Sequence, residues 1–201
     1  MPPPTVAPPV LLSLDYATQQ PGLPELPQSV VAYTEGALRI GTDVPDGNHG
    51  IAADQTVYRD VIIQAELSLA EGDDDDLYGL FVRSPSPDFY YTFAVSPSGH
   101  VVVSRYDGEH DPLVAGPLAA EMPFARGLRQ TNLFQVVAIG PSLTFLLNGM
   151  VIVSEVVEAD YQEGYLGFYV HHGQQSARAE MAAHWIQVRG VFPESAESPA
   201  A

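Results

Sequence analysis

The chain has 201 residues, no cysteine and no lysine, and its 25 acidic side chains outnumber eight basic ones, all of them arginine, for a net charge of −17. The absence of cysteine excludes a disulfide framework, a thiolate metal site and a cysteine nucleophile. A chain this acidic is not expected to bind nucleic acid or an anionic membrane, because both require a positive patch. No apolar run reaches the ~18–20 residues of a membrane span, so we expect no membrane insertion of this chain.

Composition divides the chain into three parts. Residues 1–28 are rich in proline and show little alternation, which favours a Pro-rich linker or arm. Residues 191–201 predict an acidic flexible tail. Residues 29–190 have the size of one β domain. A Met followed at once by a Pro-rich run is typical of a chain cut from a longer, anchored protein, although a whole chain remains the alternative.

Short apolar runs separated by Gly, Pro, Asn and Asp predict β-strands through most of residues 29–190. In residues 61–69, for example, Ile63, Ala65 and Leu67 fall on one face and polar residues on the other, the period of a half-buried strand. Asn148-Gly149 between two apolar runs predicts a type I′ hairpin. The clearest strands are expected at residues 61–69, 78–83, 89–96, 100–106, 132–139, 143–147, 150–156, 165–171 and 181–188.

These strands cannot bury their apolar faces as one open sheet. We expect about ten to twelve of them with no helix, and two packed sheets are the usual solution to that problem. The predicted fold class is therefore all-β, a two-sheet antiparallel jelly-roll sandwich.

Five motifs in order support a closer resemblance. They are YRDVIIQAEL (58–67), LYGLFVR (77–83), DFYYTFAVSPSGHVVVSRY (88–106), TNLFQVVAIGPSLTFLLNG (131–149) and YQEGYLGFYV (161–170). Together they resemble the lectin-like, concanavalin A-like jelly rolls of the laminin-G-like and 3-keto-disaccharide-hydrolase-like bacterial families. The resemblance covers about residues 30–190 and implies the fold, but this group includes sugar-binding modules, sugar hydrolases and extracellular domains, so it does not choose a function. Such domains often carry an acidic residue in the closing strand; His184 stands there, which argues against inheriting a metal or catalytic role.

A candidate ligand-binding face follows from strand alternation. The predicted face consists of Arg83, Tyr90, Thr92, Ser104 and Tyr106. Aromatic rings of this kind stack on sugar rings while polar groups meet the hydroxyls. Two alternatives stay open: Arg83 is held by a structural carboxylate or by carbonyl groups, and the face is solvated or covered by the Pro-rich arm. The opposite parity is predicted to be core: Tyr78, Leu80, Val82, Phe89, Tyr91, Phe93 and Val95.

The acidic run at residues 71–76 suggests a cation site. Calcium takes six to eight oxygen ligands, and Asp73 and Asp75 share an orientation if the loop is extended. The prediction is a weak calcium site at Asp73 and Asp75, and the alternative is a solvated acidic turn between two strands. We expect no other cofactor.

The six histidines do not show the spacing of a zinc site. His171 and His172 are adjacent on a strand, so they point to opposite sides and at most one can join a given site.

No catalytic motif is present. The chain lacks G-x-S-x-G, a P-loop, a Rossmann fingerprint and the E-x-D-x-x-E strand of lectin-fold glucanases. We therefore expect a non-catalytic module that binds a carbohydrate or a partner protein, within a larger exported protein located outside the cell or at its surface. Two alternatives are a structural subunit that docks through its Pro-rich arm and a sugar hydrolase of the 3-keto-disaccharide-hydrolase-like type, which would need two carboxylates about 5–10 Å apart.

Overall fold

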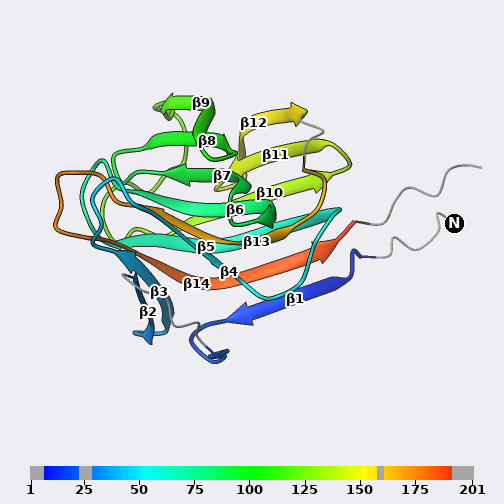
Figure 1. The fold of residues 1–201 in the computed structure, drawn as a ribbon, viewed down its shortest axis with the longest axis horizontal. Helices are drawn as coiled ribbons and strands as arrows, with labels where there is room; N and C mark the ends of the chain where they lie inside the picture. Colours follow the sequence, from blue (N-terminus) through cyan, green and yellow to red (C-terminus); the bar gives the residue numbers. More distant parts are fainter. Residues whose placement is uncertain (1–6, 23–28, 158–160, 192–201) are drawn as a thin grey trace, which may run out of the picture.

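The computed structural model describes residues 7–22, 29–157 and 161–191, and within these ranges the chain forms strands and no helix (Figure 1). The all-β prediction is confirmed. No helix long and apolar enough to cross a membrane occurs in the described residues. The strands are β1 (Val10–Asp15), β2 (Ser29–Thr34), β3 (Ala37–Thr42), β4 (Asn48–Ala52), β5 (Val61–Glu71), β6 (Leu77–Ser86), β7 (Phe89–Val95), β8 (His100–Tyr106), β9 (His110–Pro117), β10 (Asn132–Ile139), β11 (Ser142–Leu147), β12 (Met150–Val157), β13 (Tyr165–His171) and β14 (Ala179–Gly190).

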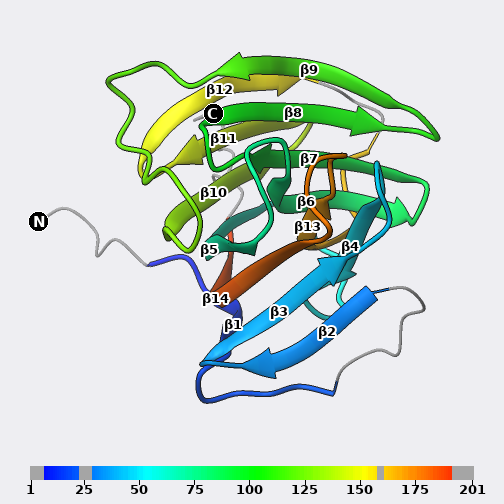
Figure 2. The same ribbon diagram turned by 90° about the vertical axis from the view of Figure 1, so that its left-hand side faces the viewer.

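The strands form two antiparallel sheets that pack as layers (Figures 1 and 2). Sheet A has the order β12-β11-β10-β5-β14-β3-β2, and β1 also pairs with β14. Sheet B has the order β4-β13-β6-β7-β8-β9. The strand order departs repeatedly from the chain order, as in a jelly roll, and the predicted two-sheet sandwich is confirmed.

The core lies between the sheets and follows the predicted parity. Phe93 of sheet B contacts Phe134 and Phe145 of sheet A, with ring centroids 5.2 and 5.3 Å apart. All three rings are fully buried, and such aromatic pairs add to the free energy of burial. The prediction was wrong for Phe89, which is 39% exposed because it opens β7 beyond the edge of the core and packs against Tyr161 instead.

The predicted hairpin at Asn148-Gly149 is present. Leu147 pairs with Met150, and the two turn residues have φ values of 48° and 81°. Positive φ at both positions is what a two-residue type I′ turn requires.

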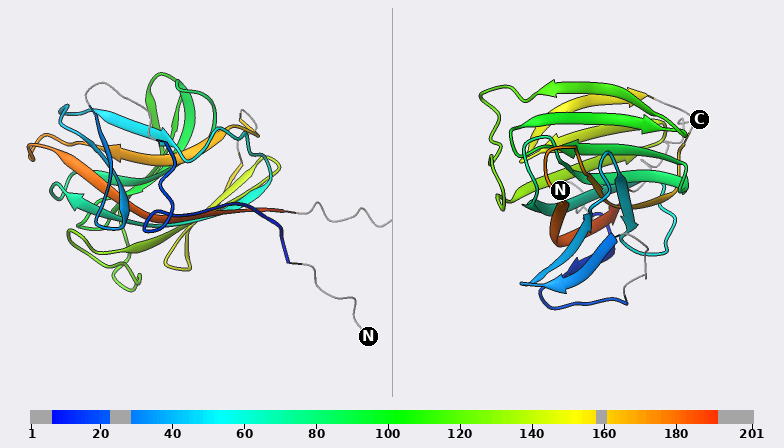
Figure 3. Two further views of the ribbon diagram at one scale, coloured as in Figure 1. Left: turned by 90° about the horizontal axis from the view of Figure 1, so that it is seen from below. Right: turned by 60° about the vertical axis from the view of Figure 1, so that its left-hand side comes forward.

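The N-terminal part belongs to the sandwich more than its composition suggests. Within the predicted arm at residues 1–28, Val10–Asp15 forms β1, which pairs with β14 on the side away from β5 (Figure 3). The described part of the arm therefore adds a strand to sheet A and does not cover the outer face of sheet B. Residues 1–6 and 23–28 of the predicted arm, and 192–201 of the predicted tail, lie outside the described residues.

Candidate ligand-binding face of sheet B

A belt of side chains crosses the outer face of sheet B from one edge strand to the other. We call it the ring belt, and each strand of the sheet contributes one residue: Asn48 (β4), Tyr169 (β13), Phe81 (β6), Tyr90 (β7), Tyr106 (β8) and His110 (β9). Tyr106 is stacked on Tyr90 with centroids 4.7 Å apart, and the His110 ring lies at the same distance from Tyr106. Phe81 and Tyr169 lie 6.1 and 6.5 Å from Tyr90. The five rings of the belt form one continuous set of contacts, and Asn48 joins them through a hydrogen bond with Tyr169.

Small residues lie beside the belt, whose Phe81 and Tyr169 rings are themselves buried. The register places Tyr169 between Gly50 and Gly79, and Gly167 beside Phe81. A Cβ on Gly79 would lie 1.9 Å from the carbonyl oxygen of Phe93, so this position admits only glycine unless the backbone shifts. A Cβ on Gly50 would lie 3.4 Å from the Phe81 ring, so that ring rests against bare backbone. Glycine thus shapes the face as much as the rings do.

Two depressions flank the belt. The larger has a volume of about 460 Å³ and extends past Ser84, Ser86 and Tyr165. The smaller has a volume of about 270 Å³ and is lined by apolar residues together with polar groups, among them Thr92 and His171. Asn48 and Tyr169 line both depressions and form the wall between them. Hollows with apolar rings and a few fixed polar groups are typical of small-molecule and sugar sites.

Asn48 is the centre of a hydrogen-bond network on this wall. Its Oδ1 accepts a bond of 2.6 Å from the Tyr169 hydroxyl and one of 2.9 Å from Nδ1–H of His171. Its Nδ2 donates to Nε2 of His110 across 2.8 Å. His110 must then carry its proton on Nδ1, which lies 3.2 Å from Oγ of Ser104. The network fixes the amide orientation of Asn48 and the tautomer of His110.

The face carries no net charge near neutral pH. Burial raises the pKa values of Tyr90 and Tyr169, so both phenols stay protonated. Burial, followed by the proximity of His171, lowers the pKa of His110 and favours its neutral form. No Asp or Glu is among the described residues that line the two depressions. The face therefore offers hydrogen bonds and ring surfaces rather than an ionic contact.

Four of the five predicted ligand-binding residues come together here. Tyr90 and Tyr106 expose part of their rings to the larger depression. Thr92 and Ser104 are buried and joined by a hydrogen bond of 2.6 Å between their hydroxyl oxygens. Because Ser104 also bonds to His110, this pair lies under the smaller depression and supports His110.

Arg83 does not join the face. Its φ is 52°, and the β6–β7 register shifts between Val82 and Ser86, so a bulge turns the side chain away. The guanidinium is buried, and Nη1 and Nη2 donate to the carbonyl oxygens of Tyr161 and Gly140 over 3.2 and 2.6 Å. Burial lowers the pKa of Arg83, an effect partly offset by the negative charge of Asp60. Placing Arg83 on the face by simple alternation was wrong because the bulge interrupts the period of two.

Sequence reasoning missed Asn48 and Tyr169 and did not place His110 or His171 in a site. The strands β4 and β9 were not predicted, because Gly50, Pro112 and Gly116 interrupt their apolar patterns. Tyr169 lay in a predicted strand, and its parity could have been read from alternation with Val170. His171 and His172 do point to opposite sides: His172 is buried and bonds to the carbonyl of Ser176.

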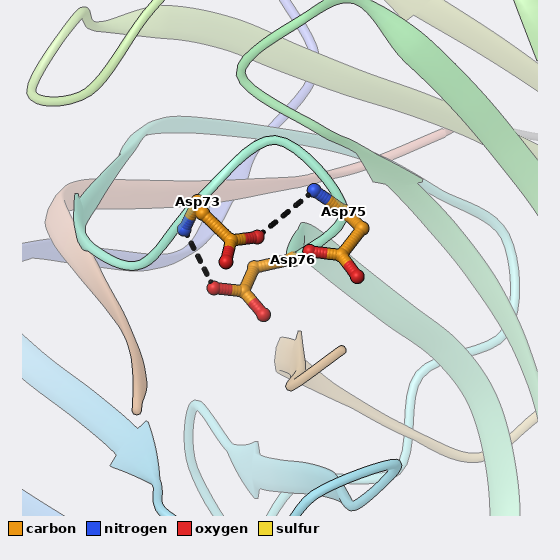
Figure 4. Close-up of side chains that lie close together, drawn as sticks. All are labelled: Asp73, Asp75 and Asp76. Atoms are coloured by element: carbon orange, nitrogen blue, oxygen red, sulfur yellow. Dashed lines mark hydrogen bonds between the residues drawn. The ribbon is translucent and has the colours of Figure 1, made fainter. Parts of the chain in front are cut away.

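The acidic loop between β5 and β6 brings three carboxylates together (Figure 4). Asp73, Asp75 and Asp76 each have an oxygen within 4.8 Å of the others. Asp76 is fully buried and accepts hydrogen bonds from the N–H groups of Asp73 and Gly173 and from the Ser176 hydroxyl. This carboxylate therefore ties the loop to the β13–β14 connection, a role that needs no ion.

Asp73 and Asp75 remain more open. The pKa of Asp73 is raised, first because its carboxyl group hydrogen-bonds with that of Asp75, while the same contact lowers the pKa of Asp75. Two such oxygens beside Asp76 are ligands that calcium accepts, but three carboxylates fall short of its usual six to eight oxygen ligands. The calcium site stays a prediction.

Comparisons with known proteins show the fold. No protein-family profile and no curated protein matches the sequence. Among solved structures, the chain is similar to the carbohydrate-binding module CBM66 from Bacillus subtilis, with a TM-score of 0.64 and 14% identity over 81% of this chain and 92% of that one. It is also similar to the catalytic domain of an endo-1,3-β-glucanase (laminarinase) from Thermotoga petrophila, with a TM-score of 0.62 and 12% identity over 93% and 99%. A third is a protein of unknown function with a galectin-like fold from Bacillus subtilis, with a TM-score of 0.60 and 12% identity over 81% and 86%. The domain is a concanavalin A-like jelly roll, as the resemblance implied.

Proposed function

We propose that the protein is a non-catalytic carbohydrate-binding module that holds a neutral glycan against the ring belt on the outer face of sheet B. The observation that carries the proposal is the belt itself, with aromatic rings laid over small residues and neutral hydrogen-bonding groups at their edges. A pyranose ring presents C–H groups on its faces and hydroxyls on its rim, so it matches this arrangement.

The uncharged character of the face supports a neutral ligand. An anionic sugar would need Arg or Lys, yet no such residue is among the described residues that line either depression, and Arg83 is buried elsewhere. The net charge of −17 further disfavours an anionic chain over long range. Some structural neighbours are named for binding or cleaving glycans, which agrees with a carbohydrate ligand.

The same linings favour binding over hydrolysis. A glycosidase needs a proton-donating carboxyl group and a second carboxylate on either side of the scissile bond. The described residues around the two depressions supply histidine, tyrosine and hydroxyl groups in their place. The sugar hydrolase is therefore the weaker alternative.

A glycan screen with two substitutions tests the proposal. The purified protein is titrated by calorimetry with linear β-1,3-glucan, mixed-linkage β-glucan, xylan, levan and galactan oligomers, and with alginate as an anionic comparison. We expect binding to at least one neutral glycan, weakened at least about tenfold by Tyr90→Ala or Tyr106→Ala. Phe89→Ala is the matched control, because Phe89 is an exposed aromatic residue next to Tyr90 in the sequence and lines neither depression.

The outcome separates the alternatives. Binding that survives both tyrosine substitutions places the ligand elsewhere, and cleavage of a glycan during the titration shows a hydrolase. A folded protein that binds no glycan contradicts the proposal and favours the structural-subunit alternative, which size-exclusion chromatography at several dilutions then examines. We further propose that the protein acts outside the cell or at its surface, where glycans of this kind are exposed; fractionation of producing cells tests this.

A further inference from the structure

Side chains from the two edge strands of sheet B meet across its outer face. Asn48 lies on β4 and His110 on β9, the first and last strands in the order β4-β13-β6-β7-β8-β9, and the two side chains are joined by the hydrogen bond of 2.8 Å between Nδ2 and Nε2. We call this contact the Asn48–His110 bridge. Six strands at ~4.8 Å spacing would hold the outer two about 24 Å apart in a flat sheet. The face is therefore a trough whose two rims meet at this point.

The space beneath the bridge is filled. The His110 ring contacts the Tyr169 ring edge to face, with centroids 6.3 Å apart and an interplanar angle of 67°. The Tyr169 hydroxyl bonds to Asn48, and the His110 ring lies against Tyr106. Contacts at these distances leave no layer into which a sugar ring could slide. The bridge and the ring belt thus close the trough from floor to rim.

The closed section separates the two depressions. The larger one lies toward Ser84 and Tyr165, near the end of β6 and the start of β13, and the smaller lies toward Leu77 and His171, at the opposite ends of the same strands. A glycan lying along the trough would have to cross the bridge to occupy both. Each depression is therefore open from its own end of the trough and blocked at the other.

We propose that the Asn48–His110 bridge is a specificity determinant that restricts this face to the ends of glycan chains and to short glycans, and excludes internal stretches of a long chain. The inference rests on the proposed function. A terminal sugar enters a depression and stacks against the belt until the bridge stops it, whereas an internal sugar has neighbours on both sides and cannot reach the same position.

The bridge is held from both sides, which suits it for this role. Asn48 is oriented by Tyr169 and His171, and His110 is oriented by Ser104, which in turn bonds to the buried Thr92. Both partners are thus fixed before a ligand arrives, so opening the bridge costs hydrogen bonds on two strands. A preformed stop of this kind selects ligands by shape.

The test compares a linear β-1,3-glucan hexamer with a cyclic β-glucan, which has no chain ends. For the wild-type protein we expect binding of the hexamer and at least about tenfold weaker binding of the cyclic glucan. His110→Ala removes one half of the bridge at an exposed position, and Asn48→Ala removes the other. Either variant is expected to bring the two affinities within about threefold of each other. His100→Ala, which replaces an exposed histidine that lines neither depression, is expected to keep the wild-type ratio.

If another neutral glycan is selected by the screen, the binding stoichiometry per chain is measured for a short and a long fraction of it. The same number of proteins on each chain at both lengths supports end recognition, and a number that grows with length overturns it. Equal wild-type affinities for the linear and cyclic glucans, or a ratio unchanged by either bridge variant, also overturn the inference. A screen in which no glycan binds is a failure of the proposed function. The existence of the Asn48–His110 bridge is then tested separately by nuclear Overhauser contacts between the Asn48 side-chain amide and the His110 ring, and the absence of these contacts overturns the inference.

Discussion

The ring belt and the acidic loop both gather functional groups, but they use them differently. In the loop, the Asp76 carboxylate accepts three hydrogen bonds from its own chain, and Asp75 accepts another from the Gln174 N–H. On the belt, ring faces of Tyr90 and Tyr106 border a hollow of about 460 Å³. A group whose bonding capacity is already used inside the protein has little left for a ligand, whereas an uncovered ring face gains free energy only when something covers it.

The comparison teaches that residue type is a weaker guide to a binding site than whether a side chain still has a hydrogen bond or a ring face free for a ligand. Four consecutive aspartates stand out in the sequence, while the belt is spread over six strands from three separate stretches of the chain, β4, β6–β9 and β13. The predictions below change one region at a time and ask whether stability or ligand binding responds.

The shape of the belt face depends on glycine, and Gly79→Val is expected to have the largest effect. A side chain at this position meets the backbone of β7, beginning with the Phe93 carbonyl oxygen at 1.9 Å from the Cβ. We expect the free energy of unfolding to fall by about 4 kcal/mol or more, or no folded protein at all. Urea unfolding measures it. Gly22→Ala is the control, because a Cβ there meets nothing within 4 Å, and a similar loss in both variants would contradict the explanation.

Removal of the buried carboxylate of the loop is expected to have the second-largest effect on stability. Asp76→Ala leaves the N–H groups of Asp73 and Gly173 without their acceptor in a buried site, so we expect a loss of about 3 kcal/mol in urea unfolding. Asp74→Ala, at an exposed position of the same loop, is expected to change stability by less than about 0.5 kcal/mol. Equal effects would mean that the loop acts through its total charge rather than through the bonds of Asp76.

The fold could be predicted from the sequence because it depends on local alternation of apolar and polar residues. Much of the site could not be predicted in this way. Tyr90 and Tyr106 could be placed on one face since their strands are regular and joined by short turns. Arg83 was wrongly placed on the ligand-binding face because nothing in the local sequence indicates the bulge after Val82. Asn48 and His110 are separated by 61 intervening positions and lie on opposite edges of the sheet, so only the curvature of the whole sheet brings them together.

Stability is expected to depend on pH through the histidines of sheet B. Burial lowers the pKa values of His49, His110 and His171 below their ordinary value of 6.5. Between the folded and unfolded pKa values the unfolded chain binds more protons, so stability is full above pH 6.5, falls as the pH drops from 6.5 toward the folded values, and levels off below them. Urea unfolding at pH 7.5, 6.5 and 5.5 checks this. His110→Gln should make the decrease shallower, and stability that rises below pH 6.5 would contradict the assignment.

Calcium is expected to have the smallest effect, because the loop offers few free oxygens. If Asp73 and Asp75 bind the ion weakly, calcium at about ten times its Kd should raise Tm by about 3–5 °C relative to a chelator. Asp75→Asn should remove the rise without removing the fold, since its other oxygen still accepts the bond from the Gln174 N–H. An identical Tm with calcium and with chelator would eliminate the site. The loop would then be a purely structural element, and the two regions would differ completely. The carboxylates of the loop connect it to the segment between β13 and β14, whereas the ring faces of the belt are free to bind a ligand.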